Sequence, residues 1–363
     1  MTQVLITGFP GFLASRLMVR LTDFYNGYHF ICLVQKKFLP QAEKLRTELM
    51  AQHPSLNGRL ELVTGDITLP DAGLEPAVLD RVIQSAEDVW HLAAIYDLAI
   101  PREPAYLVNT VGTGLIAGLA SRMKNLKHLF YISTAYVSGK RTGTIYEEEL
   151  SAGQSFRNHY EETKYLAEVE IRKFRHDLPL TIFRPGIIVG HSQTGETQKF
   201  DGPYYVIQVM DRLPKGFLMT LLGSGNHTVN LVPVDYCIGA MAWLATHADS
   251  AGKVYHLTDP SPLTQLEIAQ SFSDALGKNL HFLSVPSWLA KGVLSIGPVA
   301  QLAGLPSVLV DYFDHPHQYD CTNTLAGLEG SGIRCPSFRE VSPVLVRYFL
   351  EKKKEFATRQ ALY

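Results

Sequence analysis

Short apolar runs recur through the first half of the chain, and stretches with helical periodicity separate them. Continuous apolar runs are typical of strands covered on both faces, whereas apolar residues three or four positions apart are typical of helices. The pattern predicts strands at 3–7, 29–34, 60–63, 88–92, 129–133 and 180–184, and helices at 12–22, 42–51, 78–84, 107–123 and 160–173. Such alternation predicts an α/β fold with a Rossmann-type, doubly wound parallel sheet.

The regular alternation ends near residue 186. Residues 191–225 are rich in Gly, Gln, Thr and Pro, a further helix opens after 230–236, and 253–257 is predicted to be a strand. We therefore expect residues 1–190 to form the Rossmann domain, with later strands returning to it from about 226–258. Residues 191–363 are expected to form mainly a smaller, mostly helical C-terminal lobe.

Composition narrows the class of protein. The chain has 363 residues, 46% of them hydrophobic, which is enough for a core and argues against disorder. Its 33 Lys and Arg are balanced by 35 Asp and Glu, so the basic excess typical of nucleic-acid binders is missing, and we expect no nucleic-acid partner. The four cysteines show no C-x-x-C spacing, and no metal site is predicted.

The sequence also bears on location. The chain starts directly in a predicted strand and has no signal-peptide pattern. The apolar segment 288–310 is interrupted by Lys291, Pro298 and Pro306, so it is predicted to be a short amphipathic helix and loop, not an integral membrane segment. We expect a cytoplasmic protein.

A glycine-rich loop follows the first predicted strand. Thr7-Gly8-Phe9-Pro10-Gly11-Phe12-Leu13-Ala14 has the pattern G-x-x-G-x-x-A and opens the first predicted helix. Small residues let the backbone approach a pyrophosphate, and the helix N-terminus offers free N–H groups to it. Glycine is also common in tight turns that bind nothing, but the position between strand and helix favours dinucleotide binding.

The end of the second strand indicates which dinucleotide. A site for NAD usually offers an acidic residue about 20 residues after the glycines, to bond the ribose 2′-hydroxyl. Here the chain reads Gln35-Lys36-Lys37, with no carboxylate and two lysines. A 2′-phosphate would be attracted to these charges, so NADPH is predicted over NADH, unless the lysines are ordinary solvated loop residues.

Candidate catalytic groups occur at two further places. Tyr160 and Lys164 stand four apart at the start of a predicted helix and therefore share a face. An ammonium beside a phenol lowers the pKa of the phenol, which would make Tyr160 a usable acid or base. Ser133 and Thr134 follow the fifth strand at the carboxyl edge, where they could hold a substrate oxygen or merely cap the strand. A Tyr-x-x-x-Lys pair alone commonly lies on an exposed helix surface, so the hypothesis of a catalytic site depends on the hydroxyl groups at the end of the fifth strand.

With these motifs in place, the sequence resembles an extended short-chain dehydrogenase/reductase, most closely the fatty acyl-CoA reductase and thioester reductase branch. The motifs occur in family order and span more than half of the chain: TGFPGFLA at 7–14, GDIT at 65–68, HLAA at 91–94, NTVGT at 109–113, ISTAYVSG at 132–139, YEETK at 160–164, RPGIIVG at 184–190 and LVPVDY at 231–236.

The resemblance implies roles by position. Thr134 matches the catalytic Ser/Thr, Tyr160 the catalytic acid, Lys164 the ribose-binding lysine, and Asn109 a mainly structural asparagine counted with the catalytic set. It further implies a cofactor site made of Thr7, Gly8, Phe9, Pro10, Gly11, Phe12, Leu13, Gln35, Lys36, Asp66, Ile67, Ala93, Ala94, Tyr160, Lys164, Pro185, Gly186 and Ile188. Gln35 departs from the arginine of many relatives, which weakens the prediction of NADPH.

The predicted function is an NADPH-dependent reductase of a hydrophobic carbonyl substrate, such as an acyl thioester, a fatty aldehyde or a ketone. Apolar residues in 186–225 and 286–310 are candidates for the substrate pocket, or they form the core of the lobe. The alternatives are an NAD-dependent nucleotide-sugar epimerase or dehydratase and a non-catalytic dinucleotide sensor. A homodimer is common in the family that the chain resembles. His91 is predicted to be a buried strand histidine, and His315 and His317 to lie in a surface loop.

Overall fold

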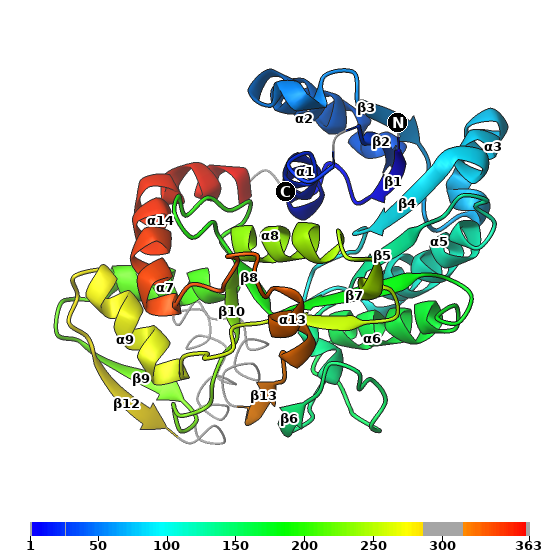
Figure 1. Ribbon diagram of the computed structural model, residues 1–363. Coiled ribbons are helices and arrows are strands. Elements are labelled where there is room, and N and C mark those ends of the chain that lie inside the picture. Colours follow the sequence, from blue (N-terminus) through cyan, green and yellow to red (C-terminus); the bar gives the residue numbers. More distant parts are fainter. Residues whose placement is uncertain (1, 26, 286–314, 361–363) are drawn as a thin grey trace.

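A seven-stranded, wholly parallel sheet forms the centre of the molecule (Figure 1). The computed structural model describes residues 2–25, 27–285 and 315–360. The strand order is β11-β7-β5-β4-β1-β2-β3, which confirms the predicted doubly wound α/β fold. The strands are β1 (Gln3–Thr7), β2 (His29–Val34), β3 (Leu60–Thr64), β4 (Ala86–His91), β5 (His128–Ile132), β7 (Leu180–Pro185) and β11 (Val254–Leu257).

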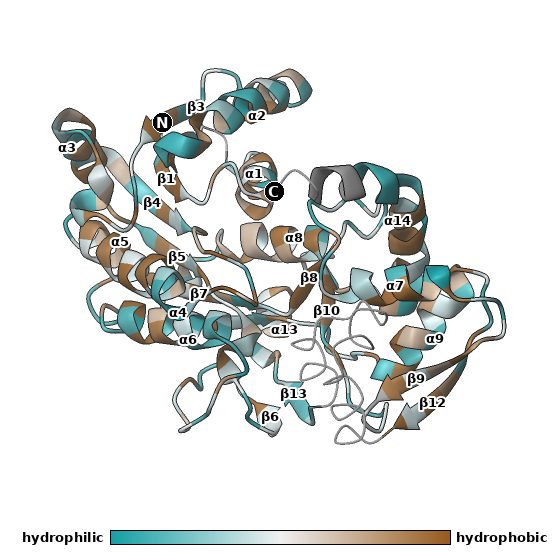
Figure 2. Ribbon diagram, turned by 180° about the vertical axis from the view of Figure 1, so that it is seen from behind, coloured by the Kyte–Doolittle hydropathy of each residue, from teal (hydrophilic) through white to brown (hydrophobic). Residues whose placement is uncertain are grey.

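Helices cover both faces of this sheet, because successive strand residues point to opposite sides. In β1, Val4 and Ile6 pack into the core beneath α1, α2 and α8, whereas Leu5 packs beneath α3, α5 and α6. Figure 2 shows helices on both sides of the sheet, with hydrophobic and hydrophilic residues alternating along them. These helices are α1 (Phe12–Leu21), α2 (Leu39–Gln52), α3 (Pro76–Ser85), α5 (Gly112–Ala120), α6 (His159–Arg172) and α8 (Val234–Leu244).

The predicted helix at 107–123 differs in the structure. It is preceded by α4 (Arg102–Ala105), passes through a π-helical turn, η4 (Tyr106–Val111), and ends as α5. Turns of this kind are frequent at functional sites. Asn109 lies in this turn, and its buried amide bonds Ile95 and Thr163 on neighbouring segments. The apolar pattern of the sequence predicts a regular helix here. It does not reveal the turn, because the hydrogen bonds of Asn109 reach segments distant in the sequence.

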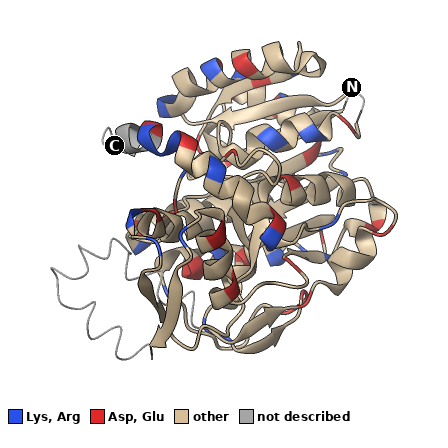
Figure 3. Ribbon diagram, turned by 90° about the vertical axis from the view of Figure 1, so that its left-hand side faces the viewer, with Lys and Arg blue, Asp and Glu red and all other residues tan. Residues whose placement is uncertain are grey.

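The C-terminal part forms a second, smaller core beside the sheet. Its elements include α7 (Pro203–Arg212), α9 (Gln265–Ala275) and α14 (Phe338–Gln360), together with two pairs of short strands, β8 (Ile187–Val189) with β10 (Leu231–Pro233) and β9 (Leu218–Leu222) with β12 (His281–Val285). A third pair, β6 (Gly143–Ile145) with β13 (His317–Tyr319), and the short helix α13 (Thr322–Gly327) connect this part to the sheet. The candidate pocket segment 286–310 lies outside the described residues. Among the helices of the described ranges, none is long and apolar enough to cross a membrane. Figure 3 shows Lys and Arg interspersed with Asp and Glu on the helices.

Candidate active site

A cavity of about 720 Å³ lies along the carboxyl edge of the sheet. It extends over the loop after β1, the ends of β4 and β5, the start of α6 and the segment after β7. The structure brings most of the predicted site residues to this cavity: Thr7, Gly8, Phe9, Pro10, Gly11, Phe12, Leu13, Gln35, Ile67, Ala93, Ala94, Thr134, Tyr160, Lys164, Pro185, Gly186 and Ile188. Three predicted residues do not line it: Lys36, Asp66 and Asn109.

The glycine-rich loop fits a pyrophosphate. Gly8 has a φ of 90°, and a side-chain Cβ there would come within 2.9 Å of the Ala93 nitrogen. Gly11 precedes α1 without any side-chain cap, and the first turn of α1 contains no acidic residue. The first N–H groups of α1 are therefore left without a side-chain acceptor, and the positive end of the helix dipole meets no carboxylate there. An anionic phosphate suits both features.

Lys37, and not Lys36, lines the far end of the cavity, together with Gln35, Phe38 and Gln41. This corrects the predicted role of Lys36. A short 3₁₀ turn, η1 (Lys36–Phe38), begins one residue after β2, so consecutive side chains point in different directions. The alternation of a strand cannot tell which of two adjacent lysines faces the cavity once the strand has ended.

Asp66 supports Gln35 from behind the cavity wall. The Gln35 amide donates a hydrogen bond from Nε2 to Asp66 Oδ2 at 2.8 Å, and Thr68 donates its N–H and its hydroxyl to Asp66 Oδ1. Although burial favours the protonated form, these bonds and the charge of Lys37 hold the pKa of Asp66 below its usual value. A carboxylate from the loop after β3 therefore lies beside Gln35, although the end of β2 carries none. The prediction that Asp66 contacts the cofactor directly is not supported by its position.

The catalytic candidates Thr134 and Tyr160 meet across the cavity. Thr134 precedes η5 (Ala135–Ser138), and its Oγ1 accepts a hydrogen bond from the Tyr136 N–H at 3.3 Å. Tyr160 lies in the first turn of α6, where Asn158 caps the helix by accepting from the Glu161 N–H at 3.0 Å. Burial raises the pKa of Tyr160 well above its usual value, and a hydrogen bond with Thr134 opposes this shift.

Lys164 does not lower the pKa of Tyr160 in this structure, which corrects the prediction from helix spacing. The two residues share a face of α6, but the Lys164 ammonium donates to Tyr131 Oη at 2.8 Å and to the Ile132 carbonyl at 2.7 Å. Burial lowers the pKa of Lys164 to about 7, and the charge of Glu168 opposes that shift. Spacing on a helix fixes which face a side chain leaves from, but it does not fix where a long side chain ends.

Asn109 and His91 belong to the supporting structure beneath the site. Asn109 joins α6 to the segment after β4, as described above, and does not reach the cavity. His91 is fully buried and lies between Thr7 Oγ1 at 2.8 Å and Thr113 Oγ1 at 2.9 Å. Burial lowers its pKa to about 3, with the charge of Lys164 acting in the same direction, so His91 is neutral. This confirms that His91 is a buried strand histidine.

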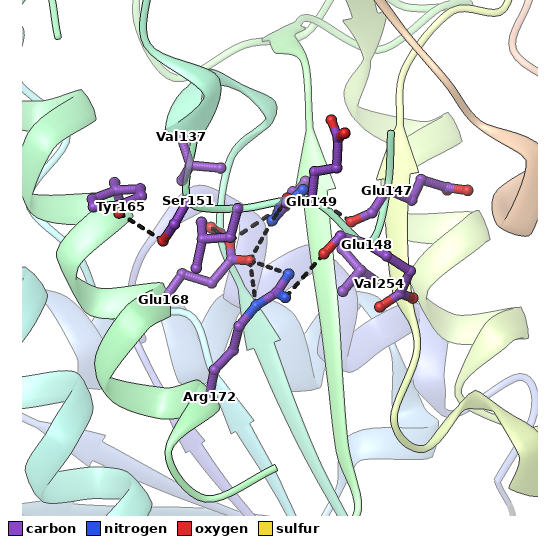
Figure 4. A network of polar contacts seen from close by, with 12 residues as sticks. Val137, Glu147, Glu148, Glu149, Ser151, Tyr165, Glu168, Arg172 and Val254 are labelled. Atoms are coloured by element: carbon purple, nitrogen blue, oxygen red, sulfur yellow. Dashed lines mark hydrogen bonds and ion pairs between the residues drawn. The ribbon is translucent and has the colours of Figure 1, made fainter. Parts of the chain in front are cut away.

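A buried ion-pair network lies behind Thr134, and sequence reasoning missed it. Glu168 of α6 accepts from the Ser133 hydroxyl at 2.7 Å, from Arg184 Nη2 at 2.5 Å and from Arg172 Nη2 at 2.8 Å. Figure 4 shows Glu168 and Arg172 within this network of polar contacts. Arg184 is fully buried and also donates to the Glu147 and Glu149 carbonyls. Ser133 itself lines the cavity, so the network reaches the wall of the site. The charge of Arg184 near the end of the otherwise apolar strand at 180–185 was the available signal.

Two further aromatic side chains near the site, His317 and Tyr96, differ from what the sequence indicated. His317 is buried in β13 and its ring lies against Tyr136 and Tyr319, so the prediction of a surface loop was wrong for it. Tyr96 lines the cavity and its ring meets that of Tyr160 edge-on, with centroids 5.1 Å apart, a contact that no motif indicated. In the described part of the chain, no group of three or more His, Cys, Asp or Glu could hold a metal ion.

The doubly wound sheet, the glycine-rich loop before α1 and the Thr-Tyr-Lys arrangement at the carboxyl edge define an extended short-chain dehydrogenase/reductase fold. Residues 6–241 match the NAD-binding family model described as "Male sterility protein". The chain belongs to this family, as its motifs predicted, and a nicotinamide dinucleotide is the cofactor that the family implies.

Curated relatives are distant but consistent with this family. A fatty acyl-CoA reductase, wat, of Drosophila melanogaster is 26% identical over 69% of this chain and 54% of its own length. The aldehyde reductase lnbA of Aspergillus flavus is 24% identical over 85% of this chain and 32% of its own length. The chain thus spans about half the length of the Drosophila relative and less of the fungal one.

Solved structures give the same fold. The terminal R domain from the myxalamid PKS-NRPS pathway superposes with a TM-score of 0.82, at 26% identity, over 98% of this chain and 92% of that one. UDP-glucuronic acid 4-epimerase from Bacillus cereus, in complex with NAD, superposes with a TM-score of 0.68 at 20% identity, over 97% and 98% of the two chains. The second likeness shows the fold alone.

Proposed function

We propose that the protein is an NADPH-dependent reductase that acts on the carbonyl of a hydrophobic acyl thioester, fatty aldehyde or ketone. The observation that carries this proposal is the meeting of Thr134, Tyr160 and Lys164 at one cavity with the glycine-rich loop. The relatives named as fatty acyl-CoA and aldehyde reductases support the same chemistry. Apolar side chains that line the cavity, among them Leu98, Val108 and Leu231, support a hydrophobic substrate.

The chain's own residues have distinct tasks in this proposal. A bound nicotinamide supplies the hydride. The hydroxyls of Thr134 and Tyr160 hold the carbonyl oxygen, and Tyr160 gives its proton to that oxygen as negative charge develops on it. The raised pKa of Tyr160 keeps the phenol protonated at neutral pH, which suits a proton donor in the direction of reduction. In this proposal Lys164, which lines the same cavity, bonds the ribose hydroxyls.

Retention of all three groups favours an enzyme over a non-catalytic sensor, since a sensor requires none of them. The nucleotide-sugar epimerase remains the alternative within the enzymes, because it uses similar groups. The two are separated by purifying the protein, identifying any bound nucleotide and following NADPH absorbance with a panel of acyl thioesters, aldehydes and ketones. Oxidation of NADPH by one of these carbonyls supports the reductase. NAD that stays bound through purification, with no net oxidation, supports the epimerase instead.

We propose NADPH over NADH because Lys37 lines the cavity beyond Gln35. Lys37→Ala should weaken NADPH binding about tenfold, the loss expected for one charged hydrogen bond to a phosphate, and should leave NADH binding unchanged. Binding is measured by nicotinamide fluorescence at fixed ionic strength.

Lys36→Ala is the matched control, because it removes the same charge one residue away from a side chain that does not line the cavity. Equal loss of NADPH binding in both variants would argue against a direct contact by Lys37. Equal loss of NADH and NADPH binding in Lys37→Ala would argue against a 2′-phosphate contact.

We also propose the division into a Rossmann domain at 1–190 and a substrate lobe mainly at 191–363, with the sheet completed by β11. We further propose a reducing compartment such as the cytoplasm as the location of the protein. This is supported by its four free cysteines, Cys32, Cys237, Cys321 and Cys335. The homodimer stays a prediction, to be tested by light scattering.

A further inference from the structure

Lys164 is held by two neutral acceptors in a buried position. Its Nζ donates to Tyr131 Oη at 2.8 Å and to the Ile132 carbonyl at 2.7 Å, and only 2% of the residue is exposed. An ammonium has three N–H donors. Two of them are committed to β5, and Lys164 also lines the cavity. The third donor is therefore left for a group inside the cavity.

Tyr131 is fixed in place for this contact. It is fully buried on the face of β5 that α6 covers, where the sequence alternation also puts Leu129. Its ring stacks on the neutral His91, with centroids 5.7 Å apart, and Lys164 Nζ lies 4.4 Å from the ring centroid. The hydroxyl also interacts with Thr113 and Ser133. These contacts restrict the Tyr131 side chain to one position, in which its hydroxyl accepts from Lys164.

The charged groups around Lys164 do not include a direct ion-pair partner among the described residues, so the hydroxyl of Tyr131 matters for the stability of the ammonium. Glu168, one turn further along α6, has its oxygens committed to Ser133, Arg184 and Arg172, and among the described residues no carboxylate pairs with Lys164. His91 on β4 is neutral, and Tyr160 on α6 is protonated because burial raises its pKa. The charged form of Lys164 is therefore stabilised chiefly by neutral oxygens and by the more distant Glu168.

We propose that Tyr131 is a positioning residue, whose hydroxyl, together with the Ile132 carbonyl, aims the third N–H of Lys164 into the cavity and stabilises its charged form. The inference rests on the proposed function of this site, in which Lys164 bonds the ribose. It assigns a task to a residue that lies outside the Thr-Tyr-Lys set and does not touch the cavity.

A pH dependence follows from this arrangement. Burial lowers the pKa of Lys164 to about 7. The ammonium is present below that value and is lost above it, so both cofactor affinity and kcat/KM should decline as the pH rises through about 7. Tyr131→Phe keeps the ring and removes one acceptor. The loss of a hydrogen bond to a charged group should move this decline to lower pH by about one unit and reduce kcat at neutral pH about tenfold.

The test measures two pH profiles between pH 5 and 9. One is the Kd of NADPH by fluorescence, which needs no turnover, and the other is kcat/KM for a carbonyl substrate that the wild-type protein reduces. Tyr165→Phe is the control, because it removes another tyrosine hydroxyl of the same neighbourhood, bonded to Ser151 at 2.8 Å and outside the cavity. Circular dichroism and melting establish that each variant folds. Tyr131→Met, which fills the space with a flexible side chain, replaces Tyr131→Phe if that variant does not fold.

The outcomes separate the two proposals. A shifted decline in Tyr131→Phe and an unshifted one in Tyr165→Phe supports the role of Tyr131. If the wild-type protein reduces a carbonyl but the decline stays at the same pH in the Tyr131 variants, the role of Tyr131 is wrong and the reductase stands. If the protein reduces no carbonyl while the decline in NADPH affinity shifts, the reductase is wrong and the positioning of Lys164 stands. If the protein binds neither NADPH nor NADH, both are wrong.

Discussion

Tyr160→Phe should reduce kcat by about 10²–10⁴-fold, the range over which a positioned proton donor contributes, and should leave the Kd of NADPH nearly unchanged. The variant removes one oxygen from a side chain in the first turn of α6, opposite Thr134. The ring remains to pack edge-on against Tyr96. Single-turnover reduction of a carbonyl by bound NADPH measures the loss directly, because it does not depend on product release.

Tyr165→Phe again serves as the control, with activity close to that of the wild-type protein. Thr134→Val tests the second hydroxyl at the carbonyl and should reduce kcat less than Tyr160→Phe, because it leaves the proton donor in place. Full activity of Tyr160→Phe would exclude Tyr160 as the donor. An output of the protein that depends on NADPH binding but not on Tyr160 would favour the sensor.

The chemical groups of the site could be predicted from the sequence because their positions follow from regular structure. The glycine loop lies between a strand and a helix, and the Thr134 position follows from the end of β5. Tyr160 and Lys164 share one face of α6 by simple spacing. In each case the backbone determines where the side chain leaves the fold, and the parallel sheet brings all strand ends to one edge.

What the sequence could not predict depends on side chains that meet across elements. Lys36 and Lys37 are adjacent residues of the same type, so the sequence does not distinguish them. The turn after β2 brings only Lys37 to the cavity. Asp66, which accepts a hydrogen bond from Gln35, lies 31 residues further along the chain, in the loop after β3. Lys164 reaches Tyr131 because its long side chain finds acceptors on β5, which no helical spacing describes. The raised pKa of Tyr160 likewise follows from burial, which depends on the assembled cavity.

The buried network behind the site links the ends of neighbouring strands to one another. Ser133 precedes Thr134 directly, and its hydroxyl donates to Glu168, whose other contacts fix Arg184 on β7 and Arg172 on α6. Arg184 Nη1 also meets His256 Nε2 on β11 at 3.1 Å, and His256 Nδ1 donates to the Asp320 carbonyl. The carboxylate of Glu168 therefore joins α6, β7 and the residue that follows β5. Through Arg184 and His256 the network reaches the segment before α13.

Glu168→Gln should lower the free energy of unfolding by about 3–5 kcal/mol, the loss typical of removing one partner from a buried ion pair. Glutamine keeps the shape of the side chain but leaves the buried Arg184 guanidinium without its counter-charge. Urea unfolding followed by circular dichroism measures the change. Activity should fall with stability at higher temperature, while the NADPH affinity of the folded fraction at low temperature should change little, because Glu168 does not line the cavity.

Glu170→Gln is the matched control on the same helix, because its ion pair with Lys173 is exposed and should contribute about 0–1 kcal/mol.

The pH dependence of stability on the acid side gives an independent test of the charge on Glu168. Burial alone would raise the pKa of Glu168, but the charges of Arg184 and Arg172 with their hydrogen bonds lower it to about 2 in the folded protein, from an ordinary value of 4.5. The stabilisation is thus complete above pH 4.5 and is lost as the pH falls towards 2, so the wild-type protein should lose more stability over this window than Glu168→Gln. Parallel acid profiles for the two proteins would show that Glu168 does not carry this charge in the folded state.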